Sequence, residues 1–213
     1  MGTPQIVFLL YGLQWTIILA LVAFAGGTVT GLIVALLRTS ESRAVSRVIA
    51  GYIALFQGTP LLMQLFVVYY ALALAGLRLE AWQAVAIGFT LHASAYLGEI
   101  WRGSIEAVPR GQVEAAKALS LGYFWRMKDV VLPQAIRISL PATIGFLVQL
   151  IKGTSLAAIV GFTELARAGS IISNTTYKPL MAYGVVGIMY FLICWPLSIW
   201  GTRLERKFAV ATR

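Results

Sequence analysis

The sequence predicts an all-α transmembrane protein, a bundle of five helical spans. Of its 213 residues, 59% are hydrophobic and 12% are charged, whereas a soluble domain carries about one quarter charged residues. The mean hydropathy is +0.82. Apolar intervals alternate with short charged segments, and each interval is close to or above the roughly 20 residues that a helix needs to cross a bilayer.

Five intervals are long enough to be spans. Four carry no charged residue and the fifth contains Lys152 alone; they are 1–37, 48–77, 81–98, 179–202 and 138–163. The expected spans lie near 12–37, 52–76, 82–103, 138–163 and 180–202. They form a single transmembrane domain over residues 1–213, and an odd number of spans places the two ends of the chain on opposite sides.

Basic residues fall mainly in the segments that would share one side of the membrane. That side would hold Arg38, Arg43, Arg47, Arg102, Arg110, Lys117, Arg126, Lys128, Arg137, Arg203, Arg206, Lys207 and Arg213. The other side would hold only Arg78, Arg167 and Lys178. Because short basic loops stay in the cytoplasm, we expect the N-terminus outside and the C-terminus inside. This rule and contact with membrane lipid explain the net charge of +9, so no nucleic-acid partner is expected.

The first span begins near the N-terminus and contains two glycines four residues apart. The opening "MGTPQIVFLLYGLQW" has no basic segment, so we interpret it as part of a span and not as a cleaved signal peptide. In "GGTVTG", Gly27 and Gly31 have the spacing that lets two membrane helices approach closely. Packing within the chain and packing against a second copy both remain open.

The second span contains "FQGTPLLMQLF" at 56–66. Thr59 can cap a helix N-terminus, Pro60 suits the first helical position, and Gly58 permits a bend. A helix that restarts or kinks inside a membrane protein can mark a solute path. The alternative is a simple helix start at the membrane surface, and the spacing alone slightly favours it.

Polar residues recur on the third span, where His92, Tyr96 and Glu99 have the i, i+4, i+7 spacing of one helix face. An ionisable group inside a membrane usually faces the bundle interior or an aqueous cavity. Glu99 lies near the end of the span, so pairing with Arg102 is favoured over solute contact. His92 alone gives little indication of its role.

The fourth span carries Gln149, Lys152 and Ser155, which recur every three residues. Lys152 lies near the middle of the span and is the best single candidate for solute contact or for an ion pair. Ser155 with His92 could suggest a serine hydrolase. That interpretation is disfavoured because the serine lacks a G-x-S-x-G setting and the histidine precedes it on another span.

Cofactor and metal sites are not expected in this chain. The sequence has no P-loop, so it does not bind ATP by that motif. A metal site is not expected, because the chain has only one histidine and one cysteine to serve as ligands. Cys194 is the sole cysteine, which excludes an internal disulfide, and we interpret it as a packing residue.

The loop 104–137 is the densest polar segment and contains "EAAKALSLGYFWRMKDVVLPQAI". Ala115, Ala116 and Ala118 would give a short helix a small, smooth surface suited to docking. Ser120 and Gly122 would break this helix, and "YFWRMKDVVLP" would form a second helix that stops at Pro133. The aromatic residues Tyr123, Phe124 and Trp125 would anchor at a membrane interface or insert into a groove of a partner.

These segments together resemble a known family. "EAAKALSLGYFWRMKDVVLPQAIRISLP" is similar to the EAA loop of ABC importer permeases. "AYLGEIWRGSIEAVPRGQVEAAKAL", "GTPLLMQLF" and "LVQLIKGTSLAAIVGFTEL" resemble its polar amino acid branch, and the likeness runs over nearly the whole chain. It implies a type I importer membrane subunit in a bacterial inner membrane. The implied partners are a second permease chain, identical or paralogous, an ABC ATPase dimer that binds ATP, and an extracytoplasmic amino-acid-binding protein.

The resemblance also implies roles for single residues. Glu114, Ala115 and Ala116 would begin the coupling helix that docks on the ATPase, and Gly111, Ser120 and Gly122 belong to the same loop. The candidates for the solute pathway, chosen from their spacing on the third and fourth spans and not from the resemblance, are Lys152, Ser155, Gln149, Glu99 and His92. A secondary transporter or channel is the alternative, although it would leave the loop without a purpose.

Three positions depart from the family pattern. Ser120 stands where a glycine is usual, so Gly122 could supply the turn instead; Gln57 replaces an arginine; and Gly153 replaces an aspartate. Losing that carboxylate while keeping Lys152 would leave a positive site. We therefore expect an acidic or neutral amino acid as solute.

Overall fold

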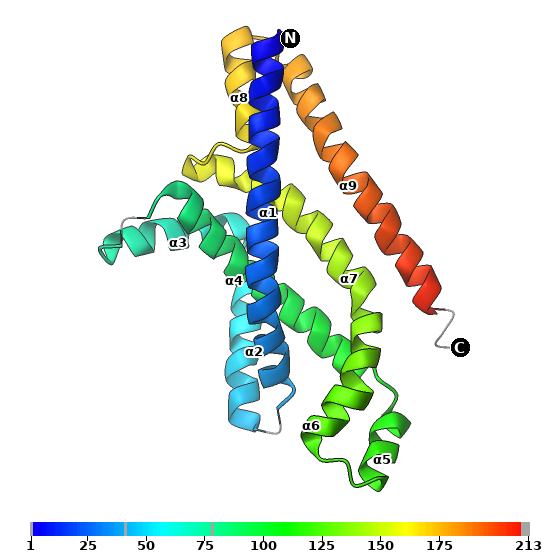
Figure 1. The fold of residues 1–213 in the computed structure, drawn as a ribbon. Coiled ribbons are helices and arrows are strands. Elements are labelled where there is room, and N and C mark those ends of the chain that lie inside the picture. The colour runs from blue at the N-terminus through cyan, green and yellow to red at the C-terminus, as the bar shows by residue number, and fades with distance from the viewer. Residues whose placement is uncertain (1, 41, 78, 210–213) are drawn as a thin grey trace.

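The computed structural model describes residues 2–40, 42–77 and 79–209, and helices make up almost all of them (Figure 1). In order, these are α1 (Thr3–Arg38), α2 (Arg43–Gly58), α3 (Leu61–Leu74), α4 (Ala81–Glu106), α5 (Arg110–Ala118), α6 (Tyr123–Trp125), the π-helix η1 (Arg126–Val131), α7 (Leu132–Gly153), the 3₁₀-helix η2 (Thr154–Val160), α8 (Leu165–Thr176) and α9 (Pro179–Ala209). Arg78 and Arg213 of the charge analysis lie outside the described residues. The all-α fold is confirmed.

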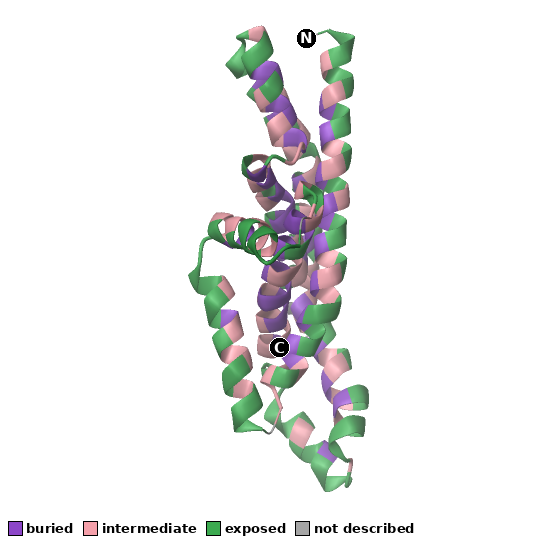
Figure 2. Ribbon diagram, turned by 90° about the vertical axis from the view of Figure 1, so that its left-hand side faces the viewer, coloured by how far each residue is buried: buried purple, intermediate pink, exposed green. Residues whose placement is uncertain are grey.

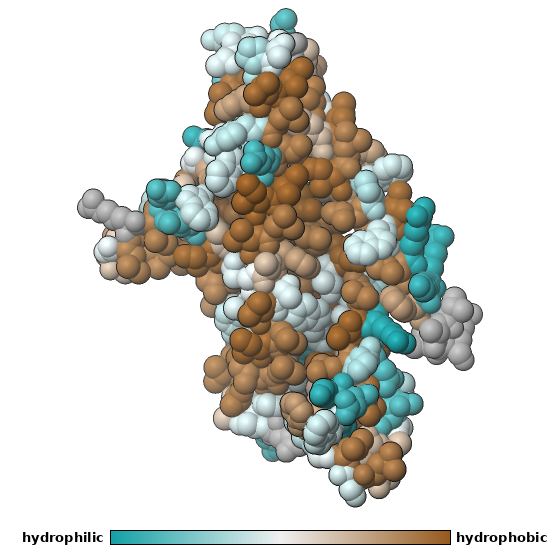
Figure 3. Space-filling view, in the orientation of Figure 1, coloured by the Kyte–Doolittle hydropathy of each residue, from teal (hydrophilic) through white to brown (hydrophobic). Residues whose placement is uncertain are grey.

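Several helices of the bundle are long and apolar enough to cross a membrane. Among the described residues, three helical stretches are long and apolar enough to cross, namely Thr3–Arg38, Tyr123–Val160 and Pro179–Phe208. The pair α2 and α3 makes a fourth if it counts as one broken span. Apolar side chains cover much of the middle of the molecule (Figure 3). The fifth crossing, expected at α4, stays a prediction.

The closest helix packing joins α1 to α4. A Cβ atom built on Gly27 would lie 2.4 Å from the Cβ of Ala93, and one on Gly31 would lie 3.1 Å from the Cβ of Leu97. Buried residues form a stripe along the side of α1 that faces the other helices (Figure 2). The two glycines therefore serve packing within the chain, which resolves the alternative that the sequence left open.

The second predicted span is broken at Thr59 and Pro60, where α2 and α3 meet at an angle of 107°. The expected restart is confirmed, and the simple helix start is wrong because α2 already runs for 16 residues before it. The predicted cap is also wrong. Thr59 donates its Oγ1 hydrogen to the carbonyl of Leu55 at 2.7 Å, and so closes α2 instead of opening α3.

A helix that the sequence analysis missed, α8, follows the fourth predicted span. α7 tightens into η2 and stops at Gly161, whose φ is +92°. The fully buried Glu164 then caps α8 by accepting hydrogen bonds from the amides of Ala166 and Arg167 at 2.9 and 2.8 Å. The hydroxyl of Tyr190 on α9 donates to the same carboxylate at 2.8 Å, so this residue joins α8 to α9.

The single cysteine has the predicted packing role. Cys194 is a free, buried thiol in a cluster with Ala20, Val148 and Ile151. It therefore helps α9 to pack against α1 and α7.

The turn after α5 is made by Ser120. Its backbone has φ +58°, its amide donates to the carbonyl of Lys117 at 2.8 Å, and the amide of Leu121 donates to that of Ala116 at 3.1 Å. These two bonds form a Schellman motif, in which glycine usually takes the left-handed position. Gly122 has φ −60°, so the suggestion that it supplies the turn is wrong.

The helix after this turn does not stop at Pro133. α6, η1 and α7 follow one another without a break from Tyr123 to Gly153, so the predicted stop is wrong. A regular α-helix would bring the proline ring against the carbonyl four residues earlier. The wider π turn of η1 precedes Pro133 and relieves this contact, while the side-chain amide of Gln134 donates to the carbonyl of Val130 at 2.8 Å.

Replacing Gly27 by alanine should lower stability by about 1 to 3 kcal/mol, because the new methyl group overlaps Ala93. Gly51 is the matched control, since nothing lies within 4 Å of a Cβ built there. Gly51→Ala should raise stability by up to about 1 kcal/mol through helix propensity. Thermal unfolding in detergent measures both; equal effects would contradict the close α1–α4 contact.

Ser120→Gly should stabilise the end of α5 by about 1 kcal/mol, because glycine adopts a left-handed backbone without steric cost. Hydrogen exchange of the α5 amides should slow accordingly. Gly122→Ala, at an ordinary φ, should leave this exchange unchanged. A faster exchange in Gly122→Ala than in Ser120→Ala would show that the turn lies at Gly122.

Candidate functional site

A cavity of about 250 Å³, lined by apolar residues and a few polar ones, lies where the broken helix meets α4 and α7. Its lining comes from three places in the sequence: Thr59, Pro60 and Leu61; His92 and Tyr96; and Phe146, Gln149, Leu150 and Gly153. Two predicted pathway residues, His92 and Gln149, are therefore brought together, with the unusual Gly153 beside them. Sites for drug-sized ligands occupy roughly 300 to 1,000 Å³, so this cavity suits a smaller molecule.

Gln64 organises one side of this cavity, and the sequence analysis missed it. Its amide nitrogen donates to the carbonyls of Phe56 and Thr59 at 2.7 and 3.0 Å. Both carbonyls lie at the end of α2, where the helix itself leaves acceptors without partners. The sequence did contain one indication of this role, because Gln64 is a single polar residue in an apolar run, four residues after Pro60.

The orientation of the Gln64 amide determines the tautomer of His92. Because the amide nitrogen faces backbone carbonyls, Oε1 is the atom 2.9 Å from Nδ1 of His92, and Nδ1 must carry the hydrogen. In an uncharged ring, Nε2 is then a hydrogen-bond acceptor. The ring lies over Tyr96 with centroids 4.5 Å apart and stacks on Phe146 at 6.2 Å, which fixes its position in the cavity wall.

The N-terminus of α3 opens on the same cavity. Pro60 precedes the helix, and no side chain caps its first amides. The residues at this helix start line the cavity. Free amides and the aligned peptide dipoles give a helix N-terminus a partial positive charge, so this part of the wall favours an anionic group.

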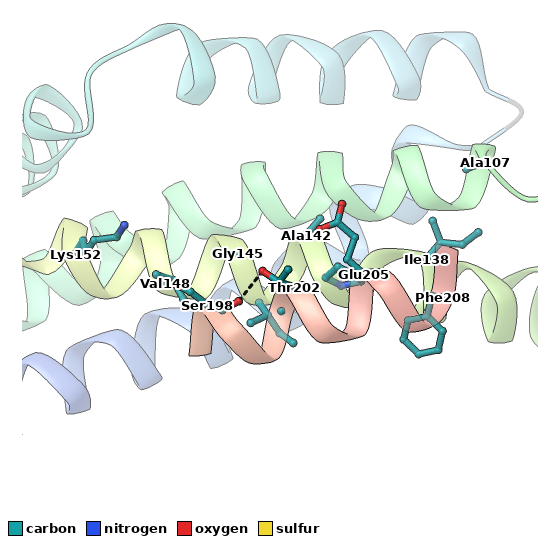
Figure 4. Close-up of a pocket in the computed structure, with 13 residues that line it drawn as sticks. Ala107, Ile138, Ala142, Gly145, Val148, Lys152, Ser198, Thr202, Glu205 and Phe208 are labelled. Atoms are coloured by element: carbon teal, nitrogen blue, oxygen red, sulfur yellow. Dashed lines mark hydrogen bonds between the residues drawn. The ribbon is translucent and has the colours of Figure 1, made fainter. Parts of the chain in front are cut away.

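Lys152 lies on another face of α7. It lines a separate cavity of about 760 Å³ between α7 and α9, together with Ser198, Thr202 and Glu205 (Figure 4). Three residues of helix fall roughly 60° short of a full turn, so Gln149 and Lys152 face different cavities. Neither salt bridge found among the described residues involves Lys152.

Ser155 and Glu99 line neither of these two cavities. The hydroxyl of Ser155 donates to the carbonyl of Lys152 at 2.8 Å, whereas His92 bonds Gln64, so no serine–histidine pair is formed. Glu99 accepts two hydrogen bonds from the guanidinium of Arg102, one of them at 2.8 Å. The favoured pairing of Glu99 with Arg102 is confirmed.

The predicted docking helix α5 has two different faces. Gly111, Ala115 and Ala118 are exposed and recur at helical spacing on the outer side. Ala116 is only 2% exposed and contributes to packing within the chain, so the expected smooth surface does not include it. Glu114 points to a charged groove on the inner side of α5.

Sequence comparison connects the chain to transport proteins. Residues 27–210 match the family "Binding-protein-dependent transport system inner membrane component". The probable amino-acid ABC transporter permease protein YckA of Bacillus subtilis is 35% identical, over 95% of this chain and 89% of its own length. The putative glutamine transport system permease protein GlnP of Rickettsia bellii is 34% identical, over 98% and 96%.

Solved structures give the same fold. The crystal structure of an amino acid ABC transporter with histidines has a TM-score of 0.88 and 31% identity, and the match covers 97% of this chain and 99% of that chain. An inward-facing structure of the MetNI methionine ABC transporter has a TM-score of 0.84 at 20% identity, over 97% and 99%, and therefore supports the fold alone. These matches decide against the secondary transporter or channel. The chain belongs to the binding-protein-dependent inner membrane components and is a permease subunit of an ATP-driven amino acid importer.

Proposed function

We propose that this permease subunit passes an amino acid with an uncharged, polar side chain through the cavity between α3, α4 and α7. One observation carries the proposal: a single cavity without charged side chains is lined both by His92, whose tautomer Gln64 fixes, and by the uncapped N-terminus of α3. Broken helices commonly provide the solute sites of membrane transporters, because their free backbone groups face a cavity.

The cavity offers a partner for each end of a zwitterion. The amides at the start of α3 can donate to the α-carboxylate. Nε2 of His92 can accept a hydrogen bond from the ammonium group. Gln149 offers an amide that can both donate and accept, which suits a polar side chain.

The lining favours a solute without net charge on its side chain. None of the residues described around the cavity is Asp, Glu, Lys or Arg, and a buried charge without a partner is costly. Lys152, on which the expectation of an acidic solute depended, lines the other cavity. The expectation of an acidic or neutral amino acid is thereby narrowed to a neutral one; this proposal rests on the lining, since the relatives include proteins named for glutamine and for arginine.

The outer face of α5 is the proposed docking surface for an ABC ATPase dimer, which would bind the ATP. Gly111, Ala115 and Ala118 expose small side chains there, so a partner can approach the helix backbone closely. A second permease chain would complete the pathway, and an extracytoplasmic binding protein would deliver the solute.

The proposed orientation places α5 in the cytoplasm and the N-terminus outside. The end of α1, the start of α2, and α5 with α6 gather at one end of the molecule, far from the start of α1 (Figure 1). Arg38, Arg43, Arg110 and Lys117 lie in these segments, and Arg126 directly follows α6. Basic residues are retained on the cytoplasmic side.

His92→Phe should reduce uptake about 10- to 100-fold, because a hydrogen bond to a charged group contributes about 1.5 to 3 kcal/mol. The measurement is uptake by the transporter reconstituted with its ATPase and binding protein, with glutamine, glutamate and arginine as competing solutes. Lys152→Gln is the control and should keep both rate and preference. Preference for glutamate or arginine, or a loss of preference in Lys152→Gln alone, would contradict the assignment.

Ala115→Trp should insert normally but weaken association with the ATPase and uncouple ATP hydrolysis from uptake, because a bulky ring blocks the close approach. Ala73→Trp, at an exposed position of α3, is the matched control and should stay coupled. Copurification of the ATPase and uptake per ATP hydrolysed measure the effect. Normal coupling in Ala115→Trp would refute docking at this face; Ala116→Trp is unsuitable because that residue is buried.

A further inference from the structure

We propose that the groove between the end of α1, the end of α4, α5 and η1 binds the phosphate headgroup of an anionic lipid. The groove is about 550 Å³ in volume, separate from the cavity assigned to the solute. It takes residues from segments far apart in the sequence, which meet at the end of the molecule that holds α5 and α6 (Figure 1).

Positive charge dominates the lining of this groove. Arg38, Arg110, Lys117 and Arg126 face it, together with the acidic Glu106 and Glu114. Glu106 is paired with Arg102, which also pairs with Glu99, and Glu114 has no ion pair among the described residues. Four cationic and two acidic side chains leave the lining with a net charge of +2, which attracts an anion.

The hydrogen-bond donors of these cations are largely available. The side chains of Arg110 and Lys117 make no hydrogen bond or ion pair within the described parts of the chain. Arg38 commits one nitrogen to Ser46, and the guanidinium of Arg126 lies 5.5 Å above the ring of Tyr123. Arginine presents paired N–H groups that match two phosphate oxygens, and lysine adds a point charge.

The position of the groove favours a lipid over a phosphate free in solution. Arg38 is the last residue of a helix apolar enough to span the membrane, so it marks the boundary with water. Tyr123, Phe124 and Trp125, next to η1, are 44%, 65% and 53% exposed. Exposed aromatic rings beside basic residues are typical of the headgroup level of a bilayer, and basic pockets between membrane helices bind anionic headgroups.

A headgroup in this groove would connect α5 to the end of α1. Arg110 and Lys117 belong to α5, and Arg38 ends α1, so one phosphate between them offsets their repulsion and holds the helices together. The placement of the coupling helix would then depend on the content of anionic lipid in the membrane.

The test measures lipid binding to the purified full-length chain by native mass spectrometry. Phosphatidylglycerol and phosphatidylcholine with the same acyl chains are the two probes. The groove variant is Arg110→Gln with Lys117→Gln; the control is Arg206→Gln with Lys207→Gln, which removes the same charge from the exposed end of α9. The wild-type chain should prefer phosphatidylglycerol. The groove variant should bind it roughly 30-fold more weakly, because each of the two basic residues removed contributes about fivefold to the affinity for anionic lipid. The control should keep the preference.

Four results would overturn the proposal. Equal losses in the two variants would indicate a general attraction to charged lipid. Equal binding of phosphatidylcholine would remove the role of the anionic headgroup. Displacement of the lipid by an equal concentration of inorganic phosphate would show a site for a soluble anion, and loss of bound lipid on assembly with the ATPase would show that a protein fills the groove. None of these results depends on uptake, so the solute assignment is tested separately.

Discussion

The close approach of α1 and α4 supports the rest of the bundle. It requires Gly27 opposite Ala93 and Gly31 opposite Leu97, because lipid provides no hydrophobic force between helices and packing must hold them together. His92 and Tyr96 precede Ala93 and Leu97 by one residue each, so the face of α4 next to this contact points to the solute cavity. Packing against α1 therefore sets the angle at which the polar residues of α4 are presented.

The break between α2 and α3 shows how a membrane protein can expose backbone groups without leaving them unpaired. The last carbonyls of α2 have no partner within the helix, and the Gln64 amide takes that role at the carbonyls of Phe56 and Thr59. The oxygen of the same amide orients His92. Gln64 thus satisfies the backbone at the end of α2 and also determines which atom of His92 can accept a hydrogen bond in the cavity.

The sequence predicted the features that composition and local spacing determine. Long apolar intervals identified α1, α7 and α9, and the small residues of the loop, apart from the buried Ala116, identified the exposed face of α5. It left the break at Pro60 open beside a simple helix start, because proline fits both, and could not give the 107° angle. It did not predict the left-handed Ser120, since the position of that turn depends on which carbonyls the next amides reach. Gln149 and Lys152 share a span but not a cavity, because three residues do not complete a helical turn.

Two helices begin inside the bundle, and their first amides are treated differently. At α8 the chain supplies its own anion, the carboxylate of Glu164, which accepts from two backbone amides and is buried completely. At α3 no side chain takes that place. The carboxylate of Glu164 shows how an amino acid's carboxylate can bind at a helix start in this protein. Because Glu164 occupies the first amides of α8, a transported amino acid cannot bind there.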